Sequence, residues 1–186
     1  MKIIRYFYQK EIKAGLLINQ SQAINIDDIK LNINTNLNEH DKYVIENKLY
    51  NVEPIFLISL INKGVITKKI SYKQESIIEL NNVELLSPIT KPNSIRDGYA
   101  FKQHVEAGRK ARGLPMIEEF DLNPVYYYSN HSAITGPGNL FFNKKHLNKL
   151  DFELEIAIVI GKEGINIKSS EAHEYIFGYT IMNDWS

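Results

Sequence analysis

Cysteine is absent from the 186 residues of the chain, and neither sign of charge is in excess. Without cysteine the chain offers no disulfide, no thiolate nucleophile and no zinc–thiolate site. This absence also fits a reducing compartment. Lysine and arginine together number 22, as do aspartate and glutamate, so the net charge is zero. A surface without excess positive charge does not favour a phosphate backbone, and we expect no nucleic-acid partner.

Long hydrophobic runs are absent as well. The longest apolar stretches, around residues 54–61 and 156–160, are far shorter than the roughly 20 residues of a membrane-spanning helix. Residues 1–7 lack the apolar centre and the small-residue cleavage site of a signal peptide. We therefore expect a cytoplasmic protein with no membrane partner. The sequence also has no glycine-rich phosphate loop and no serine in a nucleophile-elbow setting.

The composition is that of a globular protein, with 44% hydrophobic and 24% charged residues. Hydrophobic periodicity predicts a small, mostly β, N-terminal domain over residues 1–88 with one or two helices. Its expected strands are residues 1–8, 14–18 and 76–86, and its expected helices are residues 38–49 and 54–62, the second ended by Gly64. The polar residues 89–93 predict a linker.

The second domain, residues 89–186, is expected to begin with a helix. Ser94 is a good N-cap, the helix would run to about Arg112, and Gly113 is placed to end it. Residues 124–129 are aromatic and β-like, and residues 150–160 form the clearest strand pattern in the chain.

Glu153 and Glu155 lie in this clearest strand. Because side chains alternate along a strand, the two glutamates share one face with Ala157 and Val159. Like charges on a partly buried face repel, and a divalent cation is one way to offset the repulsion. The solvated face of an amphipathic strand also presents such a pair, so both interpretations stay open at this point.

Asp97, His104 and Asp184 are further candidates. Asp97 and His104 are seven residues apart, so the predicted helix would place them on one face. Asp97 also fits a capping box with Ser94, and His104 also fits a half-buried structural histidine. Asp184 ends the last predicted strand, which follows a short helix expected to run to about Tyr175 and to be broken by Gly178. Together these residues indicate a candidate all-oxygen metal site with a histidine nearby.

Four stretches resemble, in order, motifs of the fumarylacetoacetate hydrolase family. They are residues 94–105 with Asp97 and His104, residues 124–130 followed by Gly136-Pro137-Gly138, residues 150–157 with both glutamates, and residues 175–186 with Asn183-Asp184-Trp185-Ser186. The similarity is close over about residues 82–186 and loose before them. It implies an α+β fold: a small, mostly β domain followed by the first part of a mixed β-roll, the fumarylacetoacetase-like fold.

The resemblance also implies one divalent cation with four carboxylate ligands. These ligands are Asp97, Glu153, Glu155 and Asp184. Carboxylates without sulfur or nitrogen favour Mg²⁺, with Ca²⁺ or Mn²⁺ as alternatives. His104 would be the catalytic base that takes a proton from the attacking water. The implied substrate-binding residues are Tyr99, Tyr127 and, with a one-residue gap, Arg112.

The family cleaves carbon–carbon bonds of 1,3-dicarbonyl compounds such as acylpyruvates, so we expect a hydrolase acting on a small 2-oxo acid. Some members are hydratases, isomerases or decarboxylases of 2-oxo acids, and a non-catalytic fragment is a third interpretation. The family's motif continues past Asn-Asp-Trp-Ser, and its later lysine and glutamate would follow Ser186. We therefore expect an incomplete domain with weak catalysis or none, and a homodimer if the chain is complete.

Overall fold

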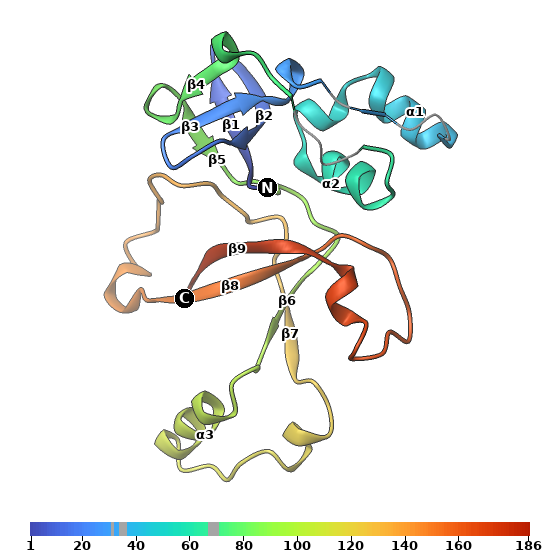
Figure 1. Cartoon of the computed structure of the whole chain (residues 1–186). Helices are drawn as coiled ribbons and strands as arrows, with labels where there is room; N and C mark the ends of the chain where they lie inside the picture. Colours follow the sequence, from blue (N-terminus) through green and yellow to red (C-terminus); the bar gives the residue numbers. More distant parts are fainter. Residues whose placement is uncertain (31, 34–36, 67–70) are drawn as a thin grey trace. The chain divides into compact units, whose positions relative to one another are not determined.

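The chain forms two compact units in the computed structural model, which describes residues 1–30, 32–33, 37–66 and 71–186 (Figure 1). One unit combines Met1–Ile89 with Gly136–Ser186, and the other is Thr90–Thr135. The first segment of the larger unit ends one residue after the domain boundary expected at residue 88. The division into two domains at that boundary stays a prediction.

An antiparallel sheet of five strands, in the order β4-β3-β2-β1-β5, lies in the first unit (Figure 1). Its strands are β1 (Ile3–Tyr8), β2 (Glu11–Leu17), β3 (Gln22–Asn25), β4 (Ile77–Glu79) and β5 (Glu84–Leu86). Gln9 and Lys10 close the β1–β2 hairpin with φ of 51° and 67°, as a two-residue type I′ turn requires. The first two predicted strands are confirmed, whereas the strand expected over residues 76–86 is interrupted between β4 and β5 by a 3₁₀ turn.

Two α-helices, α1 (Glu39–Glu46) and α2 (Pro54–Asn62), accompany this sheet, as the periodicity predicts. Asn38 caps α1, because its side-chain oxygen accepts a hydrogen bond from the Asp41 amide at 2.8 Å. α2 begins with proline and ends before Gly64, whose φ is +70°. The 3₁₀ helices of the unit are η1 (Ile26–Asp28), η2 (Leu49–Asn51), η3 (Gln74–Ser76), η4 (Leu80–Asn82), η6 (Leu147–Lys149) and η7 (Ala172–Tyr175).

The hydrophobic core lies where the sheet and the two helices meet. Ile24, Val44, Leu57 and Leu60 are each only 1% exposed, and they belong to one cluster. Burying a side chain of this size stabilises the fold by about 1.5–3 kcal/mol. Near the core, the buried Asp41 pairs with Lys63 at 2.6 Å, which links α1 to the end of α2.

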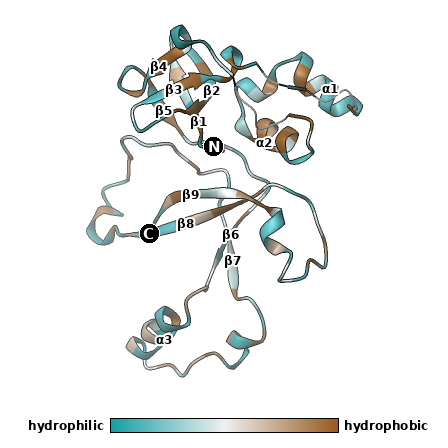
Figure 2. Ribbon diagram, in the orientation of Figure 1, coloured by the Kyte–Doolittle hydropathy of each residue, from teal (hydrophilic) through white to brown (hydrophobic). Residues whose placement is uncertain are grey.

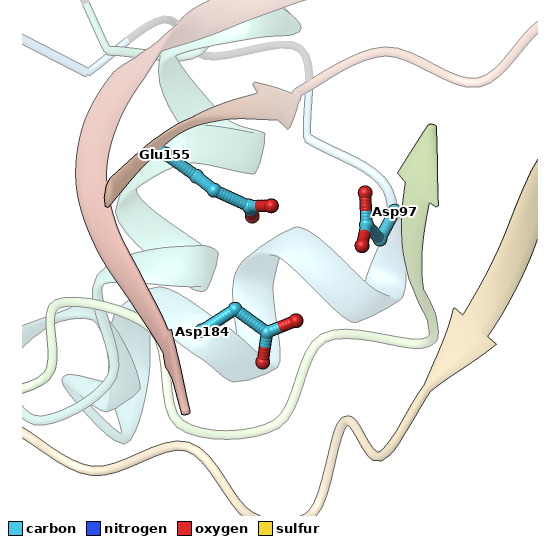
Figure 3. A group of neighbouring side chains, drawn as sticks. All are labelled: Asp97, Glu155 and Asp184. Atoms are coloured by element: carbon cyan, nitrogen blue, oxygen red, sulfur yellow. The ribbon is translucent and has the colours of Figure 1, made fainter. Parts of the chain in front are cut away.

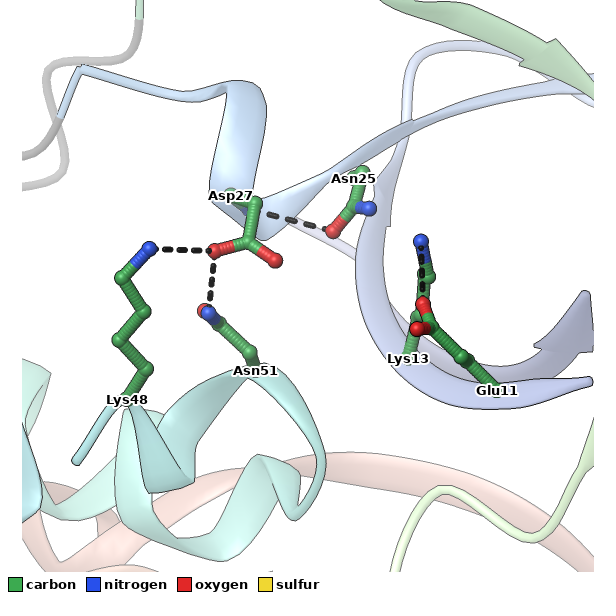
Figure 4. Close-up of polar contacts among 6 residues, drawn as sticks. All are labelled: Glu11, Lys13, Asn25, Asp27, Lys48 and Asn51. Atoms are coloured by element: carbon green, nitrogen blue, oxygen red, sulfur yellow. Dashed lines mark hydrogen bonds and ion pairs between the residues drawn. The ribbon is translucent and has the colours of Figure 1, made fainter.

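A polar network connects η1 with η2 beside this core (Figure 4). The Asp27 carboxylate accepts hydrogen bonds from the Asn51 side chain and from Lys48, the latter at 3.5 Å. Asn25 caps η1 by accepting from the Asp27 amide at 3.1 Å. Burial raises the pKa of Tyr50, and the negative charge of Asp27 adds to the rise. The network therefore fixes two short helices that are distant in the sequence.

A second, two-stranded sheet in the same unit pairs β8 (Phe152–Ile160) with β9 (Ile176–Trp185). One end of this hairpin is attached to the core: the Asn62 side chain donates to the Gly161 carbonyl at 2.7 Å, and Phe177 packs against the core cluster. The strand predicted over residues 150–160 is confirmed. The short helix predicted to run to about Tyr175 is confirmed as η7, but Gly178 does not break it, because Gly178 pairs with Val159 inside β9.

The second unit consists of a short hairpin and a helix. Its elements are β6 (Ile95–Gly98), α3 (Lys102–Ala111), η5 (Glu118–Asp121) and β7 (Tyr126–Ser129). α3 buries Val105 and ends before Gly113, whose φ is +69°. α3 has ten residues, and none of the helices among the described residues has the length and apolar character to cross a membrane.

The helix expected to begin at Ser94 begins eight residues later. Residues 95–98 instead form β6, which pairs with the aromatic strand β7. Ile95 is β-branched and Gly98 is a poor helix former, so these residues do not favour a helix. Pairing with β7 therefore decides their conformation, although Ser94 is a good N-cap residue. Asp97 therefore lies on a strand and His104 in the first turn of α3, and the two do not share a helix face.

Candidate metal centre

The β8–β9 hairpin brings two carboxylates together. Glu155 lies on β8 and Asp184 on β9, and both point to the same side of the hairpin (Figure 3). In the ladder Glu153 is opposite Asp184 and Glu155 is opposite Met182, so all four residues share one face. A carboxylate oxygen of Glu155 and one of Asp184 lie within 4.8 Å of each other, and both side chains are half-buried.

This proximity has an electrostatic cost. Two unit charges 4.8 Å apart repel by about 0.9 kcal/mol in bulk water and by about 3.5 kcal/mol at an effective dielectric constant of 20. A divalent cation between the oxygens converts this repulsion into attraction to a common centre. Because the donors are carboxylates alone, the pair suits a hard cation such as Mg²⁺, Ca²⁺ or Mn²⁺.

Glu153 lies on the same face as this pair but is more exposed. It is the direct cross-strand partner of Asp184, and its side chain is in the exposed class, whereas Glu155 is half-buried. The structure thus places the two predicted glutamates and Asp184 on one surface, with Glu155 and Asp184 closest.

In the second unit, Asp97 and Tyr127 are cross-strand partners in the β6–β7 ladder. Their side chains therefore project from the same face of this hairpin. Asp97 is half-buried and is drawn on β6 in Figure 3, and Tyr127 is 51% exposed. The ladder thus brings together one residue predicted to bind metal and one predicted to bind substrate.

The other face of the same hairpin carries a group that the sequence patterns did not single out. The Arg96 guanidinium lies 5.6 Å from the ring centre of Tyr126 and 5.2 Å from that of Tyr128. Its hydrogen bond to the Tyr128 hydroxyl lowers the pKa of that tyrosine. Tyr126 and Tyr128 are two residues apart, so on a strand they share one face, and Arg96 pairs with Tyr128 across the ladder. This spacing of the two tyrosines is the sequence signal that could have revealed the arginine–tyrosine group.

The remaining predicted residues are spread along the second unit. The Tyr99 amide donates to the Val125 carbonyl at 3.0 Å directly after β6. His104 is exposed in the first turn of α3, and Arg112 caps the end of that helix, donating from Nε to the Gly108 carbonyl at 3.0 Å. The roles predicted for these three side chains stay predictions.

The C-terminal half of the chain matches the model of a known protein family. Residues 93–186, about half of the chain, match the model described as fumarylacetoacetate (FAA) hydrolase C-terminal. The matched segment contains every residue singled out above for metal, substrate or proton transfer.

Two curated relatives resemble the chain in sequence. The oxaloacetate tautomerase YisK of Bacillus subtilis (strain 168) is 34% identical over 109 residues, which are 56% of this chain and 34% of the tautomerase. Protein SAUSA300_0871 of Staphylococcus aureus (strain USA300) is 33% identical over 127 residues, which are 67% of this chain and 39% of that protein.

Two solved structures resemble the chain in fold. The fumarylacetoacetate hydrolase EaFAH of Exiguobacterium antarcticum gives a TM-score of 0.61 at 20% identity, and Cg1458 with an inhibitor gives 0.60 at 18%. Each comparison covers all of this chain and 56% and 55%, respectively, of the solved chain. These likenesses confirm a mixed α and β fold with antiparallel sheets, and the chain spans little more than half of either structure.

Proposed function

We propose, starting from the fact that the chain belongs to the fumarylacetoacetate hydrolase family, that it binds one divalent cation at Glu155 and Asp184 and acts there on a small 2-oxo acid. The observation that supports this proposal is the close, half-buried carboxylate pair on the β8–β9 hairpin. Two carboxylates held this close on a scaffold of regular strands are a preorganised site for a hard cation.

The proposed ligand set adds two residues to this pair. Glu153 shares the face of the pair, and Asp97 is the half-buried carboxylate of the second unit. The family resemblance assigns both to the metal. Four carboxylates favour Mg²⁺ first and Mn²⁺ or Ca²⁺ as substitutes.

The proposed reaction is hydrolysis of a carbon–carbon bond in a 1,3-dicarbonyl compound of the acylpyruvate type. When bound, the cation would supply Lewis-acid stabilisation of the enolate that leaves. His104 would take a proton from the attacking water, whose oxygen forms a bond to the carbonyl carbon as the carbon–carbon bond breaks. The electron pair of that bond stays on the leaving enolate, which then takes up a proton.

Binding and orientation of the substrate are proposed for three side chains of the second unit. Tyr127 projects from the same hairpin face as Asp97, so its hydroxyl would hydrogen-bond to a substrate held beside that carboxylate. Tyr99 would add a second hydroxyl, and Arg112 a charged partner for the substrate carboxylate.

A second candidate function is keto–enol tautomerisation of a 2-oxo acid. The specific observation in its favour is the 34% identity to the oxaloacetate tautomerase of Bacillus subtilis. Tautomerisation and hydrolysis both pass through an enolate, so the same cation site serves either reaction. The two differ in whether a carbon–carbon bond is broken.

One experiment tests both reactions. The protein is incubated with Mn²⁺ or with EDTA, and the enol absorbance of acetylpyruvate and of oxaloacetate is followed, with the products identified by NMR. Hydrolysis predicts acetate and pyruvate from acetylpyruvate, and tautomerisation predicts faster ketonisation of enol-oxaloacetate without cleavage. We expect either activity to require the cation and to be lost in Glu155→Gln but kept in Glu163→Gln, a matched change at an exposed loop residue. Measurable turnover that does not fall in EDTA, or that does not fall in Glu155→Gln, would contradict the proposed site.

Three further expectations accompany the proposal as predictions. The first part of a mixed β-roll, a homodimer and a cytoplasmic location follow from the resemblance or from the composition. The chain covers 34–39% of the length of the curated relatives above, so the activity of a whole family member is likewise a proposal for this chain.

A further inference from the structure

The β6–β7 hairpin has little hydrophobic support. Of the hydrophobic residues in Thr90–Thr135, a segment that the structure describes throughout, only Val105 is buried. Figure 2 shows β6 and β7 largely in teal and pale colours, whereas β8 is brown. A hairpin of two strands is at best marginally stable by itself. Contacts between its own side chains therefore contribute much of what keeps this hairpin ordered.

The register of the hairpin is not fixed by a tight turn either. Residues 99–125, which include α3, connect β6 to β7, so no two-residue loop sets the ladder. β7 begins with the three consecutive tyrosines 126–128, and a shift by one residue in either direction would still place a tyrosine opposite Asp97. Such a shift would exchange Tyr127 for a different tyrosine, because it turns every side chain of β7 to the other face.

The Arg96 side chain favours the observed register. Its guanidinium lies 5.6 Å from the ring centre of Tyr126 and 5.2 Å from that of Tyr128, and Nη2 donates to the Tyr128 hydroxyl at 3.3 Å. Gly98, opposite Tyr126, has no side chain to cover that ring. If Arg96 were opposite Tyr127 instead, the residues two positions to either side of that tyrosine would offer no ring. Only the observed register therefore gives the arginine two aromatic contacts.

We propose that Arg96 is a positioning residue that holds Asp97 and Tyr127 side by side on the opposite face of the hairpin. This inference rests on the proposed function, which assigns Asp97 to the cation and Tyr127 to the substrate. Arg96 acts through the strand pairing, because successive side chains of a strand alternate and its own side chain points to the other face. Two exposed cation–π contacts together change the equilibrium between the ordered and the frayed hairpin by roughly 5- to 30-fold.

Electrostatics and positioning predict opposite effects of removing the arginine. The guanidinium is a positive charge one residue from a carboxylate assigned to a cation. By charge alone, Arg96→Gln should therefore bind Mn²⁺ slightly more tightly than the wild type. A positioning role predicts that the same variant binds Mn²⁺ about 3- to 30-fold more weakly, because the binding-competent hairpin is less populated. The direction of the change separates the two effects.

The test is the Kd for Mn²⁺ of the 186-residue protein, measured by electron paramagnetic resonance of the free ion. Lys110→Gln is the matched control, because it removes one positive charge from an exposed position on α3 of the same unit. This control should bind Mn²⁺ as the wild type does. Arg96→Lys keeps a cation near the two rings, so it should bind more tightly than Arg96→Gln.

A second variant keeps the charge and removes a ring. Tyr128→Thr leaves a β-branched residue on the strand, and it should weaken Mn²⁺ binding as Arg96→Gln does. Combined, the two substitutions should weaken binding by less than the product of their separate effects, because they remove the same contact. In EDTA, amide exchange of residues 95–98 should be faster in both variants, while exchange in β1 should be that of the wild type and shows that the first unit is folded.

The outcomes separate this inference from the proposed function. Absence of Mn²⁺ binding by the wild type would overturn the proposed function and this inference with it. Binding by the wild type that Arg96→Gln leaves unchanged or makes tighter would overturn the inference alone. Equal weakening in Arg96→Gln and Lys110→Gln, or wild-type binding by Tyr128→Thr, would overturn it as well.

Discussion

Replacing Asp184 by Asn is expected to stabilise the cation-free protein and to remove most of the stabilisation that a divalent cation gives. The variant keeps the size of the side chain and removes one of two charges whose oxygens lie within 4.8 Å. The repulsion at that distance is between about 0.9 and about 3.5 kcal/mol, depending on the effective dielectric constant. Salt at about 0.1 M reduces it further, so we expect a gain of roughly 1–2 kcal/mol for this half-buried pair.

Thermal unfolding followed by circular dichroism measures both effects. In a protein of this size 1 kcal/mol shifts Tm by about 2–4 °C, so Asp184→Asn in EDTA should unfold roughly 2–8 °C above the wild type. With Mn²⁺ at 100 times its Kd, the wild type gains about 2.7 kcal/mol. A 100-fold weaker site in the variant would leave a gain of about 0.4 kcal/mol at the same concentration.

Glu163→Gln is the control, since it removes one negative charge from an exposed loop of the same unit. It should respond to Mn²⁺ as the wild type does. The reasoning fails if Asp184→Asn lowers Tm in EDTA, or if the variant and the wild type gain equally from the cation.

Three other predictions concern the first unit. Leu57→Ala removes a side chain that is 1% exposed in the core and should lower the free energy of unfolding by about 2–5 kcal/mol, measured by urea denaturation. Burial raises the pKa of Tyr6 above that of an unfolded tyrosine, so above about pH 10 the unfolded state loses this proton first and stability falls as pH rises. Tyr6→Phe should flatten that decline in unfolding free energy between pH 9 and 11, relative to the exposed Tyr43→Phe. Gly161→Val should loosen the hairpin from the core, because a Cβ at Gly161 would lie 2.7 Å from that of Phe177, and amide exchange in β9 should become faster than in the wild type.

Local sequence patterns predicted correctly those helices and strands whose local preference agrees with their tertiary contacts. The bounds expected for α2 are those observed, because Pro54 and Gly64 mark its ends and its apolar residues reach one core. The two-residue period of β8 likewise predicted that Glu153 and Glu155 share a face, which the ladder with β9 confirms. In both cases local preference and tertiary contacts favour the same structure.

The sequence misled where a distant segment supplied the deciding contacts. Asp97 was expected on a helix because Ser94 offers a cap, but β7, about thirty residues away, pairs with residues 95–98. Gly178 was expected to end an element, but its position opposite Val159 keeps it within β9. The closeness of Glu155 to Asp184 also depends on the register between β8 and β9, which no local pattern encodes.

Binding of Mn²⁺ to the 186-residue protein, followed by electron paramagnetic resonance of the free ion, tests the central claim most directly. The carboxylate pair predicts one bound ion per chain, a competing effect of Mg²⁺, and loss of binding in Glu155→Gln but not in Glu163→Gln. An unchanged signal of free Mn²⁺ on addition of the wild-type protein, or equal binding by Glu155→Gln, would contradict a metal centre on this hairpin.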